Sequence, residues 1–125
     1  MRKKKKIVER RRHRRFHVQE GALAILGPHP SKIGQVIDIG RGGLAFSYIA
    51  GEEPPTELTI VSIMLADKSF YLSRMPFQIV SDQEAGRSPF SSLRMGRCGG
   101  RFGELTDPET SQLEYFIQNH TVGEM

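Results

Sequence analysis

Short runs of alternating apolar residues, each ended by a cluster of glycine, proline or polar residues, occupy most of this 125-residue chain. Alternation with a period of two indicates β-strands, and the clusters between the runs indicate turns. We expect strands at residues 16–26, 33–39, 44–48, 58–65, 70–80 and 93–105. The chain is therefore expected to be mainly β, folded as a small antiparallel barrel or sandwich around a single core.

Three of the expected strands contain features that constrain their pairing. In the first strand the alternation changes phase near Gly21, as it does at a bulge or bend. In the second strand Ile33, Ile37 and Ile39 are expected to share one face. Pro76 interrupts the fifth strand and is expected at an edge, bend or bulge, because proline has no N–H to donate to a sheet.

The last segment is the one convincing helix, expected at about residues 107–121. Either Thr106 or Asp107 is suited to cap its N-terminus. Pro108 fits the first turn, and Glu109, three residues after Thr106, completes a capping box. A stripe with helical spacing is expected to pack on the sheet and consists of Leu113, Phe116, Ile117 and His120.

Charge divides the chain into two parts. Residues 1–15 contain ten Lys or Arg and one Glu, a net charge of +9, whereas residues 16–125 contain eight Lys or Arg and thirteen Asp or Glu, a net charge of −5. We therefore expect a flexible basic arm at residues 1–15 and a folded domain at residues 16–125. A basic arm on an acidic domain points to an anionic partner for the arm.

The composition excludes several classes of protein. Cys98 is the single cysteine, so there is no disulfide framework or CxxC site. His13, His17, His29 and His120 are dispersed and predict no metal site. No spacing predicts a nucleophile and base, so an enzyme is not expected. No apolar run is long enough to span a membrane, and a cytoplasmic location is expected.

Two motifs suggest a binding site. Five arginines fall within residues 10–15, and arginine presents paired donors that suit phosphate and a planar group that stacks on bases. The lysine block at residues 3–6 is better suited to diffuse attraction. The second motif is the glycine-rich segment 38–43, Asp-Ile-Gly-Arg-Gly-Gly, between two expected strands. Taken alone, that segment indicates a tight turn.

The order of these motifs resembles the PilZ domain family, bacterial receptors for the second messenger cyclic di-GMP (c-di-GMP). That family has an RxxxR motif that leads into its first strand. Here Arg11 and Arg15 match it best, because Arg15 directly precedes the first expected strand, and Arg10 and Arg14 form an alternative register. The resemblance covers about residues 9–120 and implies a split antiparallel β-barrel with a C-terminal α-helix.

The second family motif, D/N-x-S-x-x-G, is matched in part by the glycine-rich segment. Asp38 and Gly43 match its ends, but Gly40 stands where the family usually has serine. This difference removes a hydroxyl that otherwise reaches the ligand. The resemblance therefore includes a DxGxxG variant of the motif.

The resemblance implies a role for each of these residues. Arg11 and Arg15 are expected to contact phosphate and guanine, and Asp38 to accept from the guanine N1 and N2 hydrogens. Gly43 is expected to let the backbone approach the ligand. An arginine at the position of Arg10 is associated in the family with two stacked c-di-GMP molecules per site, so we expect two.

The expected function is that of a signal receptor. Ligand is expected to order the arm and so to change a surface that meets a protein partner, which the sequence does not identify. One alternative is a nucleic-acid-binding barrel that uses the arm, which the acidic domain disfavours. Another is a PilZ-like adaptor that has lost nucleotide binding, for which Gly40 is the main indication. No cofactor is expected.

Overall fold

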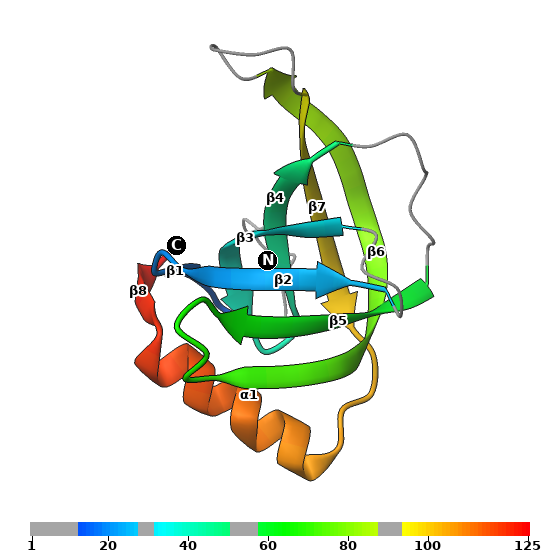
Figure 1. Ribbon diagram of the computed structural model, residues 1–125. Helices are drawn as coiled ribbons and strands as arrows, with labels where there is room; N and C mark the ends of the chain where they lie inside the picture. Colours follow the sequence, from blue (N-terminus) through cyan, green and yellow to red (C-terminus); the bar gives the residue numbers. More distant parts are fainter. Residues whose placement is uncertain (1–12, 28–31, 51–57, 88–93) are drawn as a thin grey trace, which may run out of the picture.

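The computed structural model describes residues 13–27, 32–50, 58–87 and 94–125 (Figure 1). Over these ranges the chain forms eight strands and one helix. In chain order they are β1 (Arg15–Val18), β2 (Ala22–Leu26), β3 (Lys32–Gly40), β4 (Gly43–Ile49), β5 (Leu58–Leu65), β6 (Tyr71–Arg87), β7 (Arg94–Phe102), α1 (Asp107–Asn119) and β8 (Thr121–Glu124).

Six of the strands close into an antiparallel barrel. The hydrogen-bonded order is β2-β5-β6-β7-β4-β3, and a further pairing between β2 and β3 completes the circle. Strands β1 and β8 lie outside this circle and extend the sheet from β3. Closure is possible because β3 pairs with β2 near its start, with β4 along most of its length and with β1 at its end. The expected antiparallel barrel with a C-terminal helix is confirmed.

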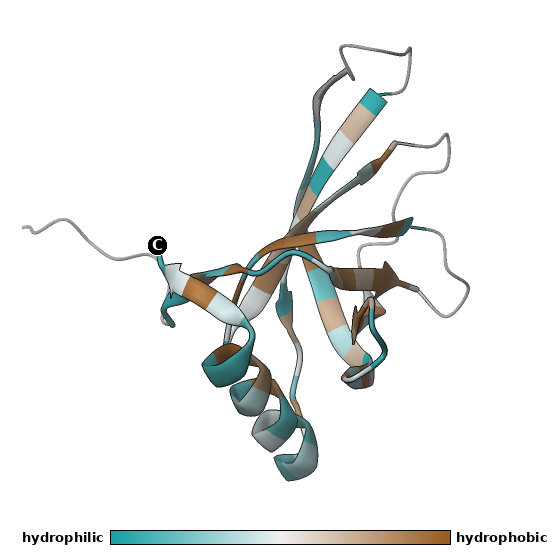
Figure 2. Cartoon of the chain, turned by 60° about the vertical axis from the view of Figure 1, so that its left-hand side comes forward, coloured by the Kyte–Doolittle hydropathy of each residue, from teal (hydrophilic) through white to brown (hydrophobic). Residues whose placement is uncertain are grey.

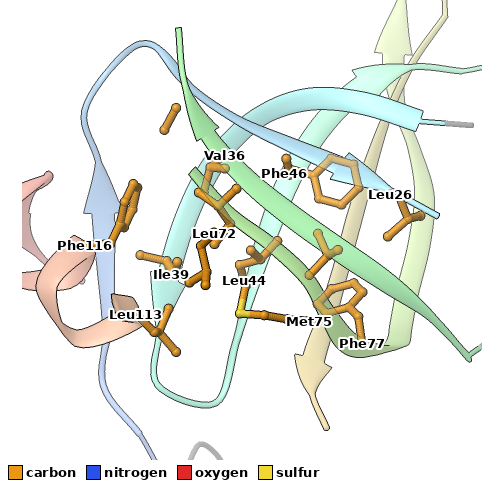
Figure 3. Packing of buried hydrophobic residues seen from close by; sticks show 14 of the residues in the cluster. Leu26, Val36, Ile39, Leu44, Phe46, Leu72, Met75, Phe77, Leu113 and Phe116 are labelled. Atoms are coloured by element: carbon orange, nitrogen blue, oxygen red, sulfur yellow. The ribbon is translucent and has the colours of Figure 1, made fainter. Parts of the chain in front are cut away.

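The core fills the space inside the barrel. Leu44 and Phe46 of β4 are fully buried there, and Ile39, Met75 and Phe77 pack in the same cluster. Figure 3 shows these side chains enclosed by the strands. Burial of large apolar side chains at about 1.5–3 kcal/mol each supplies most of the favourable free energy of such a domain.

Helix α1 begins and packs as its sequence predicts. Thr106 is the N-cap, its Oγ1 accepts from the N–H of Glu109 at 3.2 Å, and Glu109 Oε1 accepts from the N–H of Thr106 at 2.9 Å. Leu113 and Phe116 are buried in the core, and His120 is half-buried next to the last turn. Figure 2 shows the rest of α1 as mostly hydrophilic, as expected for a helix that contacts the barrel along one stripe.

Two expectations about the first strands change in the structure. The expected strand at 16–26 is two strands, because Gly21 adopts a φ of +93° between β1 and β2. The expected shared face of Ile33, Ile37 and Ile39 is wrong. A bulge between Val36 and Asp38 shifts the alternation by one residue, so Val36 and Ile39 are buried while Ile33 is 52% exposed.

The later strands differ from expectation mainly in length. Strand β6 continues to Arg87, seven residues beyond the expected end, and β8 was not expected at all. Pro76 lies in the part of β6 that pairs with β5 only, since pairing with β7 starts at Phe77. A bulge and the positive φ of Arg74 come two residues before it. The expected irregularity at Pro76 is confirmed.

Candidate functional site

An ion pair joins the two sequence motifs. Arg15 Nη1 donates to Asp38 Oδ1 at 2.7 Å, and the Asp38 side chain is only 2% exposed. The pair follows from the sheet register, in which Arg15 lies opposite Gly40 and His17 lies opposite Asp38. Arg15 and Asp38 are therefore diagonal neighbours on the same face of the sheet. The end of RxxxR and the start of the DxGxxG segment meet on the outer wall of the barrel.

A second arginine reaches the same carboxylate from another strand. Arg97 of β7 places its Nη2 3.5 Å from Asp38 Oδ2. A buried carboxylate is stable only when charge and hydrogen bonds compensate for its lost hydration. Here one oxygen of Asp38 is held by Arg15 and the other faces Arg97. Asp38 thus links β3 to both β1 and β7.

These residues line a groove of about 650 Å³ on the outer wall of the barrel. That volume is within the range of small-molecule sites. The floor is built from small residues that the register places side by side, since Gly99 of β7 lies opposite Ala45 of β4 and Ser81 of β6. The lining residues are His13, Arg15, Asp38, Gly42, Ala45, Val80, Ser81, Arg97, Gly99, Gly100, Arg101 and Phe102.

The groove is cationic although the domain is acidic. Arg15, Arg97 and Arg101 carry three positive charges around the single carboxylate of Asp38. Arg101 is oriented by a 3.1 Å hydrogen bond from its Nε to Gln78 Oε1. Residues 16–125 as a whole carry a net charge of −5, so the positive groove lies on an acidic domain. Such a site attracts an anion and offers it paired donors.

The structure indicates which register of RxxxR places an arginine in the groove. Arg15 lines the groove, whereas Arg14 is 77% exposed and its Nε lies 3.3 Å from Glu124 Oε2 of β8. This placement favours the register that ends at Arg15. Arg10 and Arg11, the other arginines of the expected site, lie outside the described residues.

The two motif glycines lie where strands approach closely. A Cβ on Gly40 would come within 2.1 Å of the backbone oxygen of Arg14, and a Cβ on Gly43 within 2.0 Å of that of Gly100. In this arrangement serine does not fit at position 40. Neither glycine is among the residues that line the groove, whereas Gly42 is.

Sequence reasoning missed the contribution of β7. Arg97, Gly99 and Arg101 alternate along this strand and so share its outward face. Two arginines at i and i+4 on either side of an outward-facing glycine were the available signal, but their closeness to Asp38 depends on barrel closure.

A second polar cluster lies within the barrel. The Tyr48 hydroxyl donates to Asp82, and the Lys32 ammonium lies 4.4 Å from the centroid of the Tyr48 ring. Burial raises the pKa of Tyr48 well above its usual range, and the hydrogen bond to Asp82 raises it further. Burial also raises the pKa of the Cys98 thiol, to about 12. Both groups are protonated at neutral pH, and the thiol is therefore a poor nucleophile.

The described part of the chain offers no metal site. No three His, Cys, Asp or Glu side chains in it come close enough together to hold an ion. Within the same residues, no helix has the length and apolar character needed to cross a membrane.

The fold and the site define the class of protein to which this chain belongs: a closed antiparallel β-barrel with a cationic groove on its outer wall. No family model matches the sequence, and no curated protein matches it significantly. Solved structures match its fold. The PilZ domain with c-di-GMP of YcgR from Escherichia coli matches with a TM-score of 0.67 at 16% identity, covering 90% of this chain and 92% of that chain.

Two longer proteins match in the same way. The K. pneumonia MrkH–c-di-GMP complex has a TM-score of 0.66 at 16% identity, covering 90% of this chain and 53% of that chain. E. coli YcgR in complex with c-di-GMP has a TM-score of 0.62 at 17% identity, covering 89% and 46%. The chain thus spans about half the length of these two proteins. The resemblance to the PilZ family is confirmed for the fold, which is that of a PilZ domain.

Proposed function

We propose that this protein is a receptor for c-di-GMP that binds the nucleotide in the groove around Arg15 and Asp38, and that it is not an enzyme. The observation that carries the proposal is the Arg15–Asp38 pair, which joins the two motifs at a cationic groove. The PilZ fold adds support, because matching structures of YcgR and MrkH are described as c-di-GMP complexes.

The chemistry of the groove suits this ligand. C-di-GMP has two phosphates and two guanines, so a receptor needs positive charge, planar donors and an acceptor for the guanine edge. Arg15 supplies donors for phosphate or for guanine O6 and N7. Asp38 supplies the acceptor for the N1 and N2 hydrogens. The small residues of the floor leave room for a planar base.

The arm completes the proposal. Arg10 and Arg11 lie three and two positions before His13, the first described residue, and a dianion seated next to Arg15 would attract them. A ligand bridging the arm and the Asp38 turn would fix the arm against the barrel and change the surface offered to a protein partner. The presence of Arg10 leads us to expect two stacked c-di-GMP molecules per chain.

Calorimetric titration of the full chain with c-di-GMP tests the proposal. We expect binding in the micromolar range or tighter with two ligands per chain, and Arg15→Ala should abolish it. Cyclic di-AMP, which has the same phosphates but adenine bases, is the matched control and should bind far more weakly. Absence of heat at tens of micromolar c-di-GMP, from protein shown to be folded by circular dichroism, overturns the proposal. It would favour an adaptor without nucleotide binding.

A further inference from the structure

Of the three arginines of the groove, Arg97 has the longest side-chain contact to the rest of the fold. Its side chain is 51% exposed, and within the described residues its one hydrogen-bond or ion-pair partner is Asp38, at 3.5 Å. Arg15, in contrast, is 18% exposed and holds the other Asp38 oxygen at 2.7 Å. Of the two contacts to Asp38, the one to Arg97 is longer and weaker.

The surface of the groove next to Arg97 is made of small residues. Gly99 follows two positions later on the same outward face of β7, and the register places Ala45 and Ser81 on either side of it. A Cβ on Gly99 would lie 3.2 Å from Ser81 Oγ, so a larger side chain there would intrude on the groove. Gly99 thus leaves space on the floor of the groove for a planar ring to lie beside the guanidinium of Arg97.

Binding of guanine at Asp38 has a consequence for its partners. The N1 and N2 hydrogens of guanine need an acceptor, and both Asp38 oxygens already face arginines. An incoming donor that takes the place of one guanidinium would displace the weaker contact, which is the one to Arg97. The released guanidinium has paired donors that fit the O6 and N7 acceptors of guanine, or an adjacent phosphate.

We propose that Arg97 is a further ligand-binding residue, which leaves Asp38 when a guanine nucleotide enters and recognises a guanine base over the Gly99 floor. This inference rests on the proposed function and adds a third strand, β7, to a site that the motifs assign to the arm and the Asp38 turn. Arg97 then sets the preference for guanine, because its paired donors match O6 and N7 and do not match the amino group of adenine.

Substitution of Arg97 in the full chain tests this inference, with c-di-GMP titrated by calorimetry. Arg97→Ala should weaken binding by about tenfold or more. Arg97→Lys should weaken it comparably, because lysine keeps the charge but loses the paired planar donors. The matched control is Arg94→Ala on the same strand. Arg94 is 46% exposed and its partner is Glu84, so this variant should bind within about twofold of wild type.

The possible outcomes separate this inference from the proposed function. Wild-type protein that fails to bind c-di-GMP contradicts the proposed function, and this inference with it. Wild-type protein that binds while Arg97→Ala binds equally well overturns the role of Arg97 and leaves the proposed function standing. Full affinity in Arg97→Lys also overturns it, because charge alone then accounts for the effect. Unfolding midpoints above the assay temperature establish that each variant is folded.

Discussion

At the scale of single residues, Asp38 has a structural role, and we propose for it a second role in ligand recognition that competes with the first. In the structure it is a buried anion that ties β1 and β7 to β3 through Arg15 and Arg97. In the proposed complex it accepts hydrogen bonds from the ligand. In the proposed function the same side chain contributes both to stability and to recognition, and Arg15 cannot be treated as part of a loose arm. It is the first residue of β1.

Removal of Arg15 should therefore destabilise the fold as well as prevent binding. Arg15→Ala leaves the carboxylate of Asp38 with Arg97 alone, and we expect a loss of about 3 kcal/mol in the free energy of unfolding, the lower end for a broken buried pair because Arg97 remains. The double variant Arg15→Ala/Asp38→Ala should lose less than the sum of the single variants, since the coupling of such a pair is about 1–3 kcal/mol. Urea unfolding of the four proteins measures this coupling.

A second ion pair in the chain provides the control. Arg41 and Glu114 are 2.9 Å apart, but their side chains are 63% and 36% exposed. Solvent screens such a pair, so its coupling energy should be at most about 0.5 kcal/mol. Equal coupling in the two cycles would show that burial of Asp38 contributes nothing to the strength of its pair.

At the scale of elements, the sequence predicted what depends on local pattern. Strand β5 was expected at 58–65 and is found there, because both of its faces carry apolar residues. Helix α1 was expected from its capping box and stripe. The end of β6 was missed because residues 81–87 are polar and show no alternation. Strand β8 was missed because four residues after a helix carry too little pattern, and its pairing with β1 is a long-range contact.

The site divides in the same way. Arg15 and Asp38 were predicted because they belong to motifs with a fixed order in the chain. Arg97 was not, because it lies 59 residues from Asp38 and meets it only when β7 pairs with β4. Local sequence thus revealed the half of the groove contributed by β1 and β3. The half contributed by β7 depends on tertiary structure.

The helix cap offers a prediction that separates fold from site. Thr106→Ala removes the side chain that accepts from the N–H of Glu109, and should cost about 1 kcal/mol of stability. Thr106→Ser keeps the hydroxyl and should cost much less. C-di-GMP affinity should be unchanged in both, because Thr106 does not line the groove. Thermal unfolding and calorimetry measure the two effects, and a parallel loss of affinity would contradict the separation.

At the scale of the whole molecule, closure of the barrel shields the core from solvent until the domain unfolds. Cys98 is 0% exposed in that core, and its thiol has a pKa of about 12 in the folded protein. In the unfolded chain a thiol titrates near about 8.5. Because the folded pKa is the higher one, the neutral Cys98 thiol contributes fully to the free energy of unfolding below about pH 8.5. This contribution is lost as the pH rises from there toward about 12.

Alkaline unfolding should therefore depend on Cys98. Between about pH 9 and 10.5, wild-type protein should lose about 1 kcal/mol of stability per pH unit more than Cys98→Ala does. The measurement is the free energy of urea unfolding at several pH values under reducing conditions. The comparison uses slopes, so the cavity left by the alanine does not affect it. Parallel slopes would show that the folded protein ionises this thiol as readily as the unfolded chain does.

The pairing of β1 with β8 has a mechanical consequence. The N–H of Met125 donates to the backbone oxygen of Arg15 at 2.9 Å, so the start of β1 lies directly beside the end of β8. A force that pulls these two points apart acts along the hydrogen bonds of an antiparallel ladder and breaks them one after another. Under tension we therefore expect this ladder to open from this end, where the first hydrogen bond is accepted by the backbone of Arg15, the residue that we propose binds the ligand. Bound nucleotide would then stabilise the end of the β1–β8 ladder that separates first.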